Sequence, residues 1–274
     1  ASTGFNKSDY EYIDSNLIST LKLIELIKKN KKNNINRILF TSTSSVYGEG
    51  QYLCNNHQIV TKVTRRIFDL ENKNWEPFCP LCNSKIIPTF TNEDCETSNQ
   101  HIYAITKNMS ENIFRNFSSE YNINTTILRL PVLFGNKNGE GIISVFVNKI
   151  INNEKIFLNE DGNQLRDFLS YENLVKVIDY LAFNKSKRLI YNIGSGSSIS
   201  LIKLIEFISN EVKFKANIEI SNKYREGDVR NIFLDNKLFT REFSNLSLRS
   251  FESNLSLTIK DIISEKINIA QIGV

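Results

Sequence analysis

The chain has 274 residues, of which 41% are hydrophobic and 23% charged, which is the composition of an ordinary globular protein. Such a length can bury one large domain or two smaller ones. The net charge of +4 is too small to predict binding to nucleic acid, and without a run of about eighteen apolar residues the sequence predicts no membrane span.

Four segments alternate between helical and extended patterns. Apolar residues recur every three or four positions over 10–29 and again over 103–119, which predicts two helices. Short apolar runs at 36–43 and 125–130 predict two buried strands. Helix, strand, helix and strand in this order predict an α/β fold in which helices cover a parallel sheet.

Residues 51–98 show neither the periodicity of a helix nor that of a strand. They contain all four cysteines, the single tryptophan and three of the four prolines. A connection of this length is unusual inside a compact domain, so we expect a small inserted module.

Two half-sites for a metal lie in this insert. Cys54-Asn-Asn-His57 and Cys79-Pro-Leu-Cys82 have the spacing of ligands that bind one zinc ion tetrahedrally, which predicts a structural zinc site with no open coordination position. The alternative is a set of ordinary buried thiols, which is how we interpret Cys95. Cysteines in this pattern, without a secretory leader, predict a reducing compartment and hence the cytoplasm.

The second half has shorter elements. We expect a mixed α/β lobe over 136–274, with part of 164–187 returning to the central sheet. The predicted helices are 141–152, 171–183, 200–212 and 256–265, and the predicted strands lie near 155–158 and 189–193.

A phenol and an ammonium group share one face of the helix predicted over 103–119. Tyr103 and Lys107 are four residues apart, and a nearby cation lowers the pKa of a phenol. Thr43 ends a predicted parallel strand, where ligands bind in open α/β sheets. Together the three form a proton-transfer site for an alcohol and ketone pair, in which a dinucleotide would take the hydride. The Tyr-x-x-x-Lys spacing alone is also common on exposed helices.

Six motifs in order carry a family resemblance. The chain resembles the extended short-chain dehydrogenases/reductases, the NAD-dependent nucleotide-sugar epimerases and dehydratases, which implies a Rossmann-like doubly wound sheet. The motifs are Phe40-Thr-Ser-Thr-Ser-Ser-Val-Tyr-Gly48, Tyr103-x-x-x-Lys107, Arg129 to Gly135, Gly162-Asn-Gln-Leu-Arg-Asp-Phe168, Tyr191-Asn-Ile-Gly-Ser-Gly196 and Tyr224-Arg-Glu-Gly-Asp228.

The resemblance implies roles for residues near the cofactor. Tyr103 would be the acid/base, and Lys107 would orient the nicotinamide ribose of NAD and lower the pKa of Tyr103. Thr43 would bond the reacting oxygen of a nucleotide-sugar substrate, and Pro131 would lie beside the cofactor. Val132 would contact the substrate at a place where the family often has asparagine.

The resemblance also implies how the substrate's diphosphate is held. Arg166 and Arg225 match the positions that clamp it, because a guanidinium group can bond two phosphate oxygens at once. The alternative for Arg166 is an ion pair with its neighbour Asp167. An equivalent alternative for Arg225 is an ion pair with nearby carboxylates.

Two features reduce the number of reactions that the chain could catalyse. Dehydratases of the family carry an Asp-Glu pair directly after the hydroxyl residue, whereas this chain has Ser44 and Ser45. The cysteine-rich insert resembles that of the dTDP-L-rhamnose 4-epimerase group, which implies inversion at C4 of a dTDP-6-deoxyhexose. The alternatives are an NAD(P)-dependent reductase of a 4-keto nucleotide sugar, which Val132 favours, and a truncated, non-catalytic binding protein.

The start of the chain departs from the family. No Gly-x-x-Gly-x-x-Gly motif occurs, and residues 1–4 match the loop after the fourth strand. We therefore expect residues 1–135 to form a partial dinucleotide-binding domain that lacks roughly seventy N-terminal residues, two or more βα units. The family also implies a homodimer formed through the Tyr103 helix and its neighbour.

Overall fold

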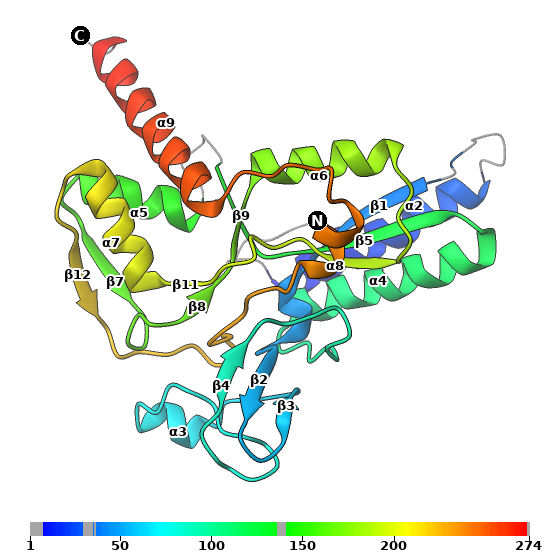
Figure 1. The fold of residues 1–274 in the computed structure, drawn as a ribbon, viewed down its shortest axis with the longest axis horizontal. Helices are drawn as coiled ribbons and strands as arrows, with labels where there is room; N and C mark the ends of the chain where they lie inside the picture. Colours follow the sequence, from blue (N-terminus) through cyan, green and yellow to red (C-terminus); the bar gives the residue numbers. More distant parts are fainter. Residues whose placement is uncertain (1–7, 30–34, 36, 136–140, 273–274) are drawn as a thin grey trace.

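The computed structural model describes residues 8–29, 35, 37–135 and 141–272. Residues 1–4, which the family resemblance aligns with a loop, lie outside these ranges. A three-stranded sheet with helices on both faces forms one side of the molecule, a second lobe forms the other, and the insert projects between them (Figure 1).

The central sheet is parallel, with the order β1 (Arg37–Thr43), β5 (Asn124–Leu130) and β10 (Ile190–Asn192). Side chains alternate between its two faces. Ile38 and Phe40 pack with α2 (Ser19–Lys29) and α4 (Ile102–Tyr121), whereas Leu39 packs with α6 (Tyr171–Phe183) on the opposite face. A parallel sheet covered on both faces confirms the predicted α/β class.

The first helical segment contains a wider turn. A capping box between Ser8 and Glu11 starts α1 (Asp9–Tyr12), and a π-helical stretch, η1 (Ile13–Ile18), joins it to α2. Asn16 is buried in this stretch, where its side chain donates to Thr106 Oγ1 at 3.1 Å and its carbonyl accepts from Ser110 Oγ at 3.2 Å. The π turn therefore ties this helix to α4.

The insert forms a unit with its own small core. Strands β2 (Gln51–Cys54), β3 (Gln58–Val60) and β4 (Ile87–Thr89) pair antiparallel in the order β3-β2-β4, with α3 (Ile67–Glu71) beside them. The buried side chains of this core are Tyr52, Cys54, Val60, Val63, Cys79 and Ile86.

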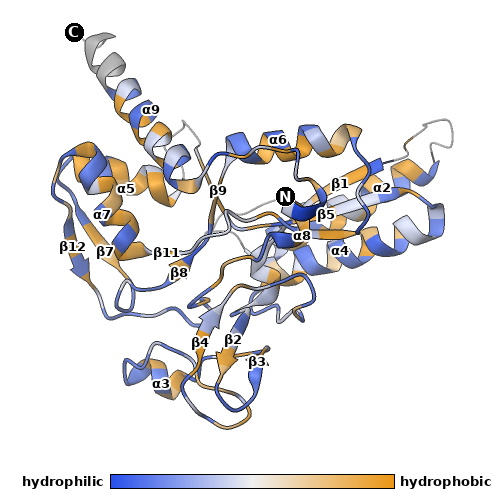
Figure 2. Ribbon diagram, in the orientation of Figure 1, coloured by the Kyte–Doolittle hydropathy of each residue, from blue (hydrophilic) through white to orange (hydrophobic). Residues whose placement is uncertain are grey.

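The second lobe has the largest hydrophobic cluster. It packs α5 (Ile142–Ile151), α7 (Leu201–Val212) and α9 (Phe251–Ile272) against β7 (Lys155–Leu158), which pairs in parallel with β12 (Asn217–Ile220). Figure 2 shows α5 as mostly hydrophobic, whereas α9 alternates between hydrophobic and hydrophilic residues. None of the helices in the described ranges combines the length and apolar composition that crossing a bilayer requires.

Short strands connect the two lobes. Parallel pairing joins β6 (Val132–Phe134) to β9 (Phe168–Ser170), and antiparallel pairing joins β8 (Leu165–Arg166) to β11 (Ile199–Ser200). These strands, together with β12 and α8 (Lys237–Glu242), were not predicted, because segments this short have no detectable periodicity. The last helix was predicted over 256–265, whereas α9 begins at Phe251 and ends at Ile272.

Candidate active site

Thr43 marks the carboxyl end of β1. Its backbone is extended, and its Oγ1 caps the 3₁₀ helix η2 (Ser44–Tyr47) by accepting from the Ser45 amide at 3.2 Å. The Thr43 side chain also lies near enough to the Tyr103 hydroxyl to influence its pKa. The structure therefore brings together the two hydroxyl groups that the sequence placed in one site.

Tyr103 lies in the first turn of α4. His101 caps this helix, with its Nδ1 accepting from the Ala104 amide at 3.3 Å. The Tyr103 ring lies beside those of Tyr12 and His101, with centroid distances of 5.8 and 5.9 Å. Burial raises the pKa of Tyr103, and the Thr43 side chain opposes this increase.

Lys107 follows one turn later and is buried. Its Nζ donates to the Thr41 carbonyl at 2.5 Å and lies 4.3 Å from the centre of the Phe40 ring. Burial lowers the pKa of Lys107 to about 8, and Glu111 opposes this decrease. The expected lowering of the Tyr103 pKa by Lys107 stays a prediction. In this structure the Lys107 ammonium group bonds β1, and burial raises the pKa of Tyr103.

A buried ion pair that the sequence analysis missed supports this site. Glu111 of α4 accepts from Arg129 Nη2 at 2.7 Å and from the Ser42 hydroxyl. The Arg129 guanidinium group lies 4.6 Å from the centre of the Tyr47 ring. Glu111 is four residues after Lys107, so its place on the same helix face was a usable signal.

Pro131 and Val132 lie at the same edge of the sheet as Thr43. The register of the parallel strands places Thr43 opposite Leu130, so the two residues that follow β5 lie near the end of β1. Val132 begins β6, and its amide donates to the Asp167 carbonyl at 3.3 Å. This position is compatible with the cofactor and substrate contacts predicted for Pro131 and Val132.

The guanidinium group of Arg166 is held by main-chain carbonyls. Nη1 donates to the carbonyls of Leu165 at 2.9 Å and Arg230 at 2.8 Å, and Nη2 donates to that of Val229 at 2.7 Å. The neighbouring Asp167 accepts hydrogen bonds from the amide and hydroxyl of Ser195. These contacts do not support the alternative interpretation of an Arg166–Asp167 ion pair.

Arg225 is an exposed residue between β12 and α8. The Asp228 amide donates to its carbonyl at 3.3 Å, which closes a turn at Gly227. The carbonyls of the following residues, Val229 and Arg230, are those that hold Arg166. The segment that directly follows the Arg225 motif is therefore in direct contact with the motif that contains Arg166.

Cys54, His57, Cys79 and Cys82 converge in the insert, with their donor atoms all within 4.8 Å of one another. Sγ of Cys54 lies 3.6 Å from Nδ1 of His57 and 3.7 Å from Sγ of Cys82, and Sγ of Cys79 lies 3.7 Å from the same Nδ1. A tetrahedral zinc ion, with Zn–S bonds of about 2.3 Å, requires S···S and S···N separations of about 3.8 and 3.6 Å. The donor set fits zinc.

Hydrogen bonds at this cluster change the pKa of one of its thiols. Hydrogen bonds with Ser84 and His57 lower the pKa of the Cys54 thiol to about 5, although its burial opposes the decrease. The thiolate is the form that binds metals. Cys95 is buried elsewhere, against Val46, Tyr47 and Leu234, as expected for a thiol outside the metal site.

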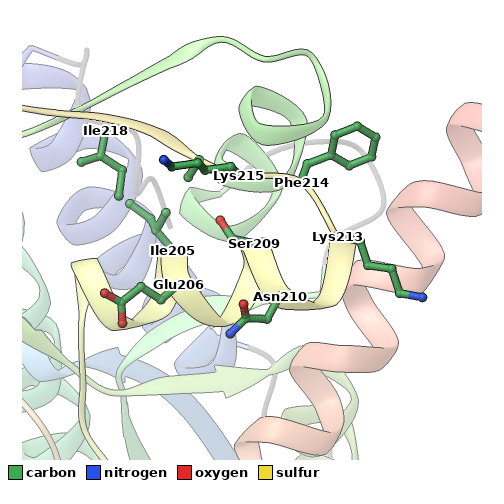
Figure 3. A pocket seen from close by; sticks show the side chains of 9 residues that line it. Ile205, Glu206, Ser209, Asn210, Lys213, Phe214, Lys215 and Ile218 are labelled. Carbon is green, nitrogen blue, oxygen red and sulfur yellow. The ribbon is translucent and has the colours of Figure 1, made fainter.

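A cavity in the second lobe lies away from these groups. It has a volume of about 640 Å³ and is lined by α7, the loop that follows it and β12 (Figure 3). Lys213, Phe214 and Lys215 line its rim, and it contains none of the predicted site residues.

Residues 3–66 and 81–194 match the model of the NAD dependent epimerase/dehydratase family. The chain belongs to this family. The match omits residues 67–80, which contain α3 and Cys79 and lie within the predicted insert.

Two curated relatives of this family are similar over most of the chain. A putative UDP-glucose 4-epimerase of Methanocaldococcus jannaschii is 28% identical over 229 residues, which cover 82% of this chain and 61% of the relative. A dTDP-L-rhamnose 4-epimerase of Burkholderia thailandensis is 28% identical over 227 residues, which cover 80% of this chain and 60% of the relative. The chain thus spans about 60% of the length of both.

A solved structure of the family has the same fold. The dTDP-glucose 4,6-dehydratase of Bacillus anthracis, in complex with NAD, superposes with a TM-score of 0.71 at 20% identity. The superposition covers 95% of this chain and 71% of that one. This likeness confirms the Rossmann-like architecture that the sequence predicted.

Proposed function

We propose that the protein containing this chain is an NAD-dependent nucleotide-sugar 4-epimerase that acts on a dTDP-6-deoxyhexose. The observation that carries the proposal is the placement of Thr43 and Tyr103 together at the end of β1, with Lys107 one helical turn beyond. The similarity to the Burkholderia dTDP-L-rhamnose 4-epimerase supports the choice of sugar. Ser44 and Ser45, which stand where a dehydratase needs carboxylates, support epimerisation over elimination.

The residues at this edge of the sheet fit a nicotinamide dinucleotide. A buried ammonium group and a half-buried phenol lie one turn apart at the carboxyl end of parallel strands, which is where doubly wound sheets bind such cofactors. We propose that Lys107 and Tyr103 hold the nicotinamide ribose and that Pro131 lies beside it. When bound, NAD would supply the acceptor and donor of the hydride at C4 of the sugar.

The chain's own side chains then handle the proton. Thr43 would hydrogen-bond the C4 oxygen, and Tyr103 would remove the proton from that hydroxyl and later return it. Lys107, once it bonds the ribose, would place its positive charge closer to the phenolate and stabilise it. Inversion requires the 4-keto sugar to turn over between the two hydride transfers while its diphosphate stays bound.

The two arginines are proposed to hold that diphosphate. Arg166 is fixed by three carbonyl groups, whereas Arg225 is exposed on the adjoining turn. Guanidinium groups from two adjoining segments can each bond phosphate oxygens, so the diphosphate would remain bound while the sugar turns. We assign residues 1–135 to the dinucleotide and 136–274 mainly to the nucleotide sugar, with Val132 contacting the substrate.

We further propose a structural zinc ion bound by Cys54, His57, Cys79 and Cys82. The separations of the donor atoms support it, and four protein ligands leave no position for substrate. Four free cysteines also support a location in the reducing cytoplasm.

A homodimer through α2 and α4 is also proposed. Leu23 and Leu26 of α2 and Met109 of α4 expose large apolar side chains, which supports burial of these helices against a second copy.

The experiment is to incubate the NAD-loaded protein with dTDP-L-rhamnose and, separately, with UDP-glucose, and to follow the sugar by NMR. The 4-epimer of the dTDP sugar should accumulate to equilibrium with no net change in NADH absorbance. Inversion of UDP-glucose alone would contradict the proposed sugar.

The second candidate is the reductase, which Val132 favours because the family's usual asparagine is absent there. A reductase would consume one NAD(P)H for each 4-keto sugar reduced and would not invert a 4-hydroxy sugar. This outcome would replace the epimerase proposal.

A further inference from the structure

Buried charges join the insert to the second lobe. Arg65 of the insert pairs with Glu49 at 3.1 Å and Glu160 at 2.6 Å, and its Nη2 donates to the Asp228 carbonyl at 2.5 Å. Arg230 pairs with the same Glu160 at 2.8 Å. The insert is therefore attached to the segment around residues 228–231 by directional contacts, which fix its position more tightly than apolar packing alone.

Glu76 adds a second attachment to this segment. One carboxylate oxygen accepts from Arg230 Nε at 2.7 Å and the other from Asn231 Nδ2 at 2.9 Å. Glu76 lies within residues 67–80, which the family model does not match. This contact is thus made by a part of the chain that the family as a whole does not define.

Both partners of Glu76 also contact β8. The Arg230 carbonyl accepts from Arg166 Nη1 at 2.8 Å, and the Asn231 side-chain oxygen accepts from the Leu165 amide at 2.9 Å. Two short hydrogen-bonded paths therefore lead from the Glu76 carboxylate to the strand that carries Arg166.

The Arg166 guanidinium group has capacity left for a ligand. A guanidinium group has five N–H donors, and three of those of Arg166 are used by the carbonyls of Leu165, Val229 and Arg230. Among the described residues no hydrogen bond occupies the other two donors, which are therefore available for phosphate oxygens. Because their direction is set by the carbonyls, displacement of the 229–231 backbone would turn them away from the diphosphate.

We propose that Glu76 is a positioning residue for nucleotide-sugar binding: through Arg230 and Asn231 it fixes the carbonyls that orient Arg166 toward the diphosphate. This inference rests on the proposed function, because it takes Arg166 as a diphosphate ligand. It gives the insert a role in substrate affinity in addition to the role of its metal site in the stability of the insert.

The test uses Glu76→Gln in the whole protein, with Glu71→Gln as the matched control. Both residues are exposed glutamates of the insert, and the 51% exposure of the Glu76 side chain makes misfolding of the variant a small risk. Arg230 retains Glu160 and Asp161 as partners in the variant, so no buried charge is left unpaired.

Glu76→Gln should raise the KM for the nucleotide sugar and the Kd for dTDP by about tenfold, the loss expected from one hydrogen bond to a charged group. kcat, NAD affinity and the affinity for thymidine should stay within about twofold of wild type, because none of them depends on the diphosphate contact. Glu71→Gln should match wild type in every measurement.

The proposal is overturned if Glu76→Gln and Glu71→Gln bind dTDP equally, or if dTDP, thymidine and NAD affinities all fall together, which would indicate general loosening. A wild-type protein that binds dTDP but inverts no sugar would contradict the proposed function. The dTDP affinities of Glu76→Gln and Glu71→Gln would then still decide whether Glu76 is a positioning residue. A wild-type protein without affinity for dTDP would overturn both.

Discussion

Replacing Glu111 with glutamine tests the buried pair that supports the site. The Arg129 and Glu111 side chains are only 5% and 1% exposed, and their closest atoms are 2.7 Å apart. Glu111→Gln would leave the Arg129 charge buried without its counterion, which typically costs about 3–5 kcal/mol of unfolding free energy. The Ser42 hydroxyl would also lose its charged acceptor.

Glu120→Gln is the matched control, because it makes the same chemical change on the same helix. Glu120 pairs with Lys28 at 3.6 Å, but the side chains are 60% and 39% exposed, so the loss should be about 0–1 kcal/mol. Urea unfolding followed by circular dichroism measures both variants. The double variant Glu111→Gln/Arg129→Met should lose less than the sum of its single variants. If Glu111→Gln costs no more than Glu120→Gln, the argument for this pair is refuted.

Three further results are expected. Tyr103→Phe should lower turnover more than about a hundredfold with nearly unchanged nucleotide-sugar affinity, because only proton transfer is lost; turnover close to wild type would remove Tyr103 from the mechanism. Cys79→Ser should release zinc and make the insert sensitive to protease, while Cys95→Ser retains the metal; elemental analysis that finds no zinc in wild type would contradict the site. Unfolding should return the pKa of Lys107 from about 8 toward 10.5, so the unfolded chain binds more protons between these values. The unfolding free energy of wild type, measured relative to Lys107→Met, should therefore rise by on the order of 3 kcal/mol from about pH 8 to about pH 10.5, and a flat difference in urea titrations would refute the burial argument.

Contacts set by local spacing were predictable from the sequence. A helical period places Tyr103 and Lys107 on one face of α4, and the end of a buried strand places Thr43 at the sheet edge. The convergence of the Cys/His cluster was likewise predicted from two short half-sites, of which Cys54 and Cys82 approach to 3.7 Å in the structure.

Contacts set by packing were not predictable in the same way. Glu111 could be assigned to its helix face, but its pairing with Arg129 depends on how α4 lies across β5. The Lys107 ammonium group can reach several acceptors, and only the packed structure shows that it bonds the Thr41 carbonyl. Strands of two residues, such as the one containing Arg166, have no period to detect, so the carbonyl contacts of Arg166 were also missed.

The attachment of the insert to the second lobe has a consequence for how the chain folds. The proposed zinc ligands lie within a short stretch, with Cys54 and Cys82 separated by 28 positions, whereas Glu76 of the insert accepts a hydrogen bond from Arg230 Nε 154 positions away. During synthesis the Cys/His cluster can therefore assemble long before Arg230 leaves the ribosome. Distant contacts also form more slowly because a longer loop must close. The insert should accordingly fold in two stages, first around its Cys/His cluster and then, as one of the last events, onto the second lobe.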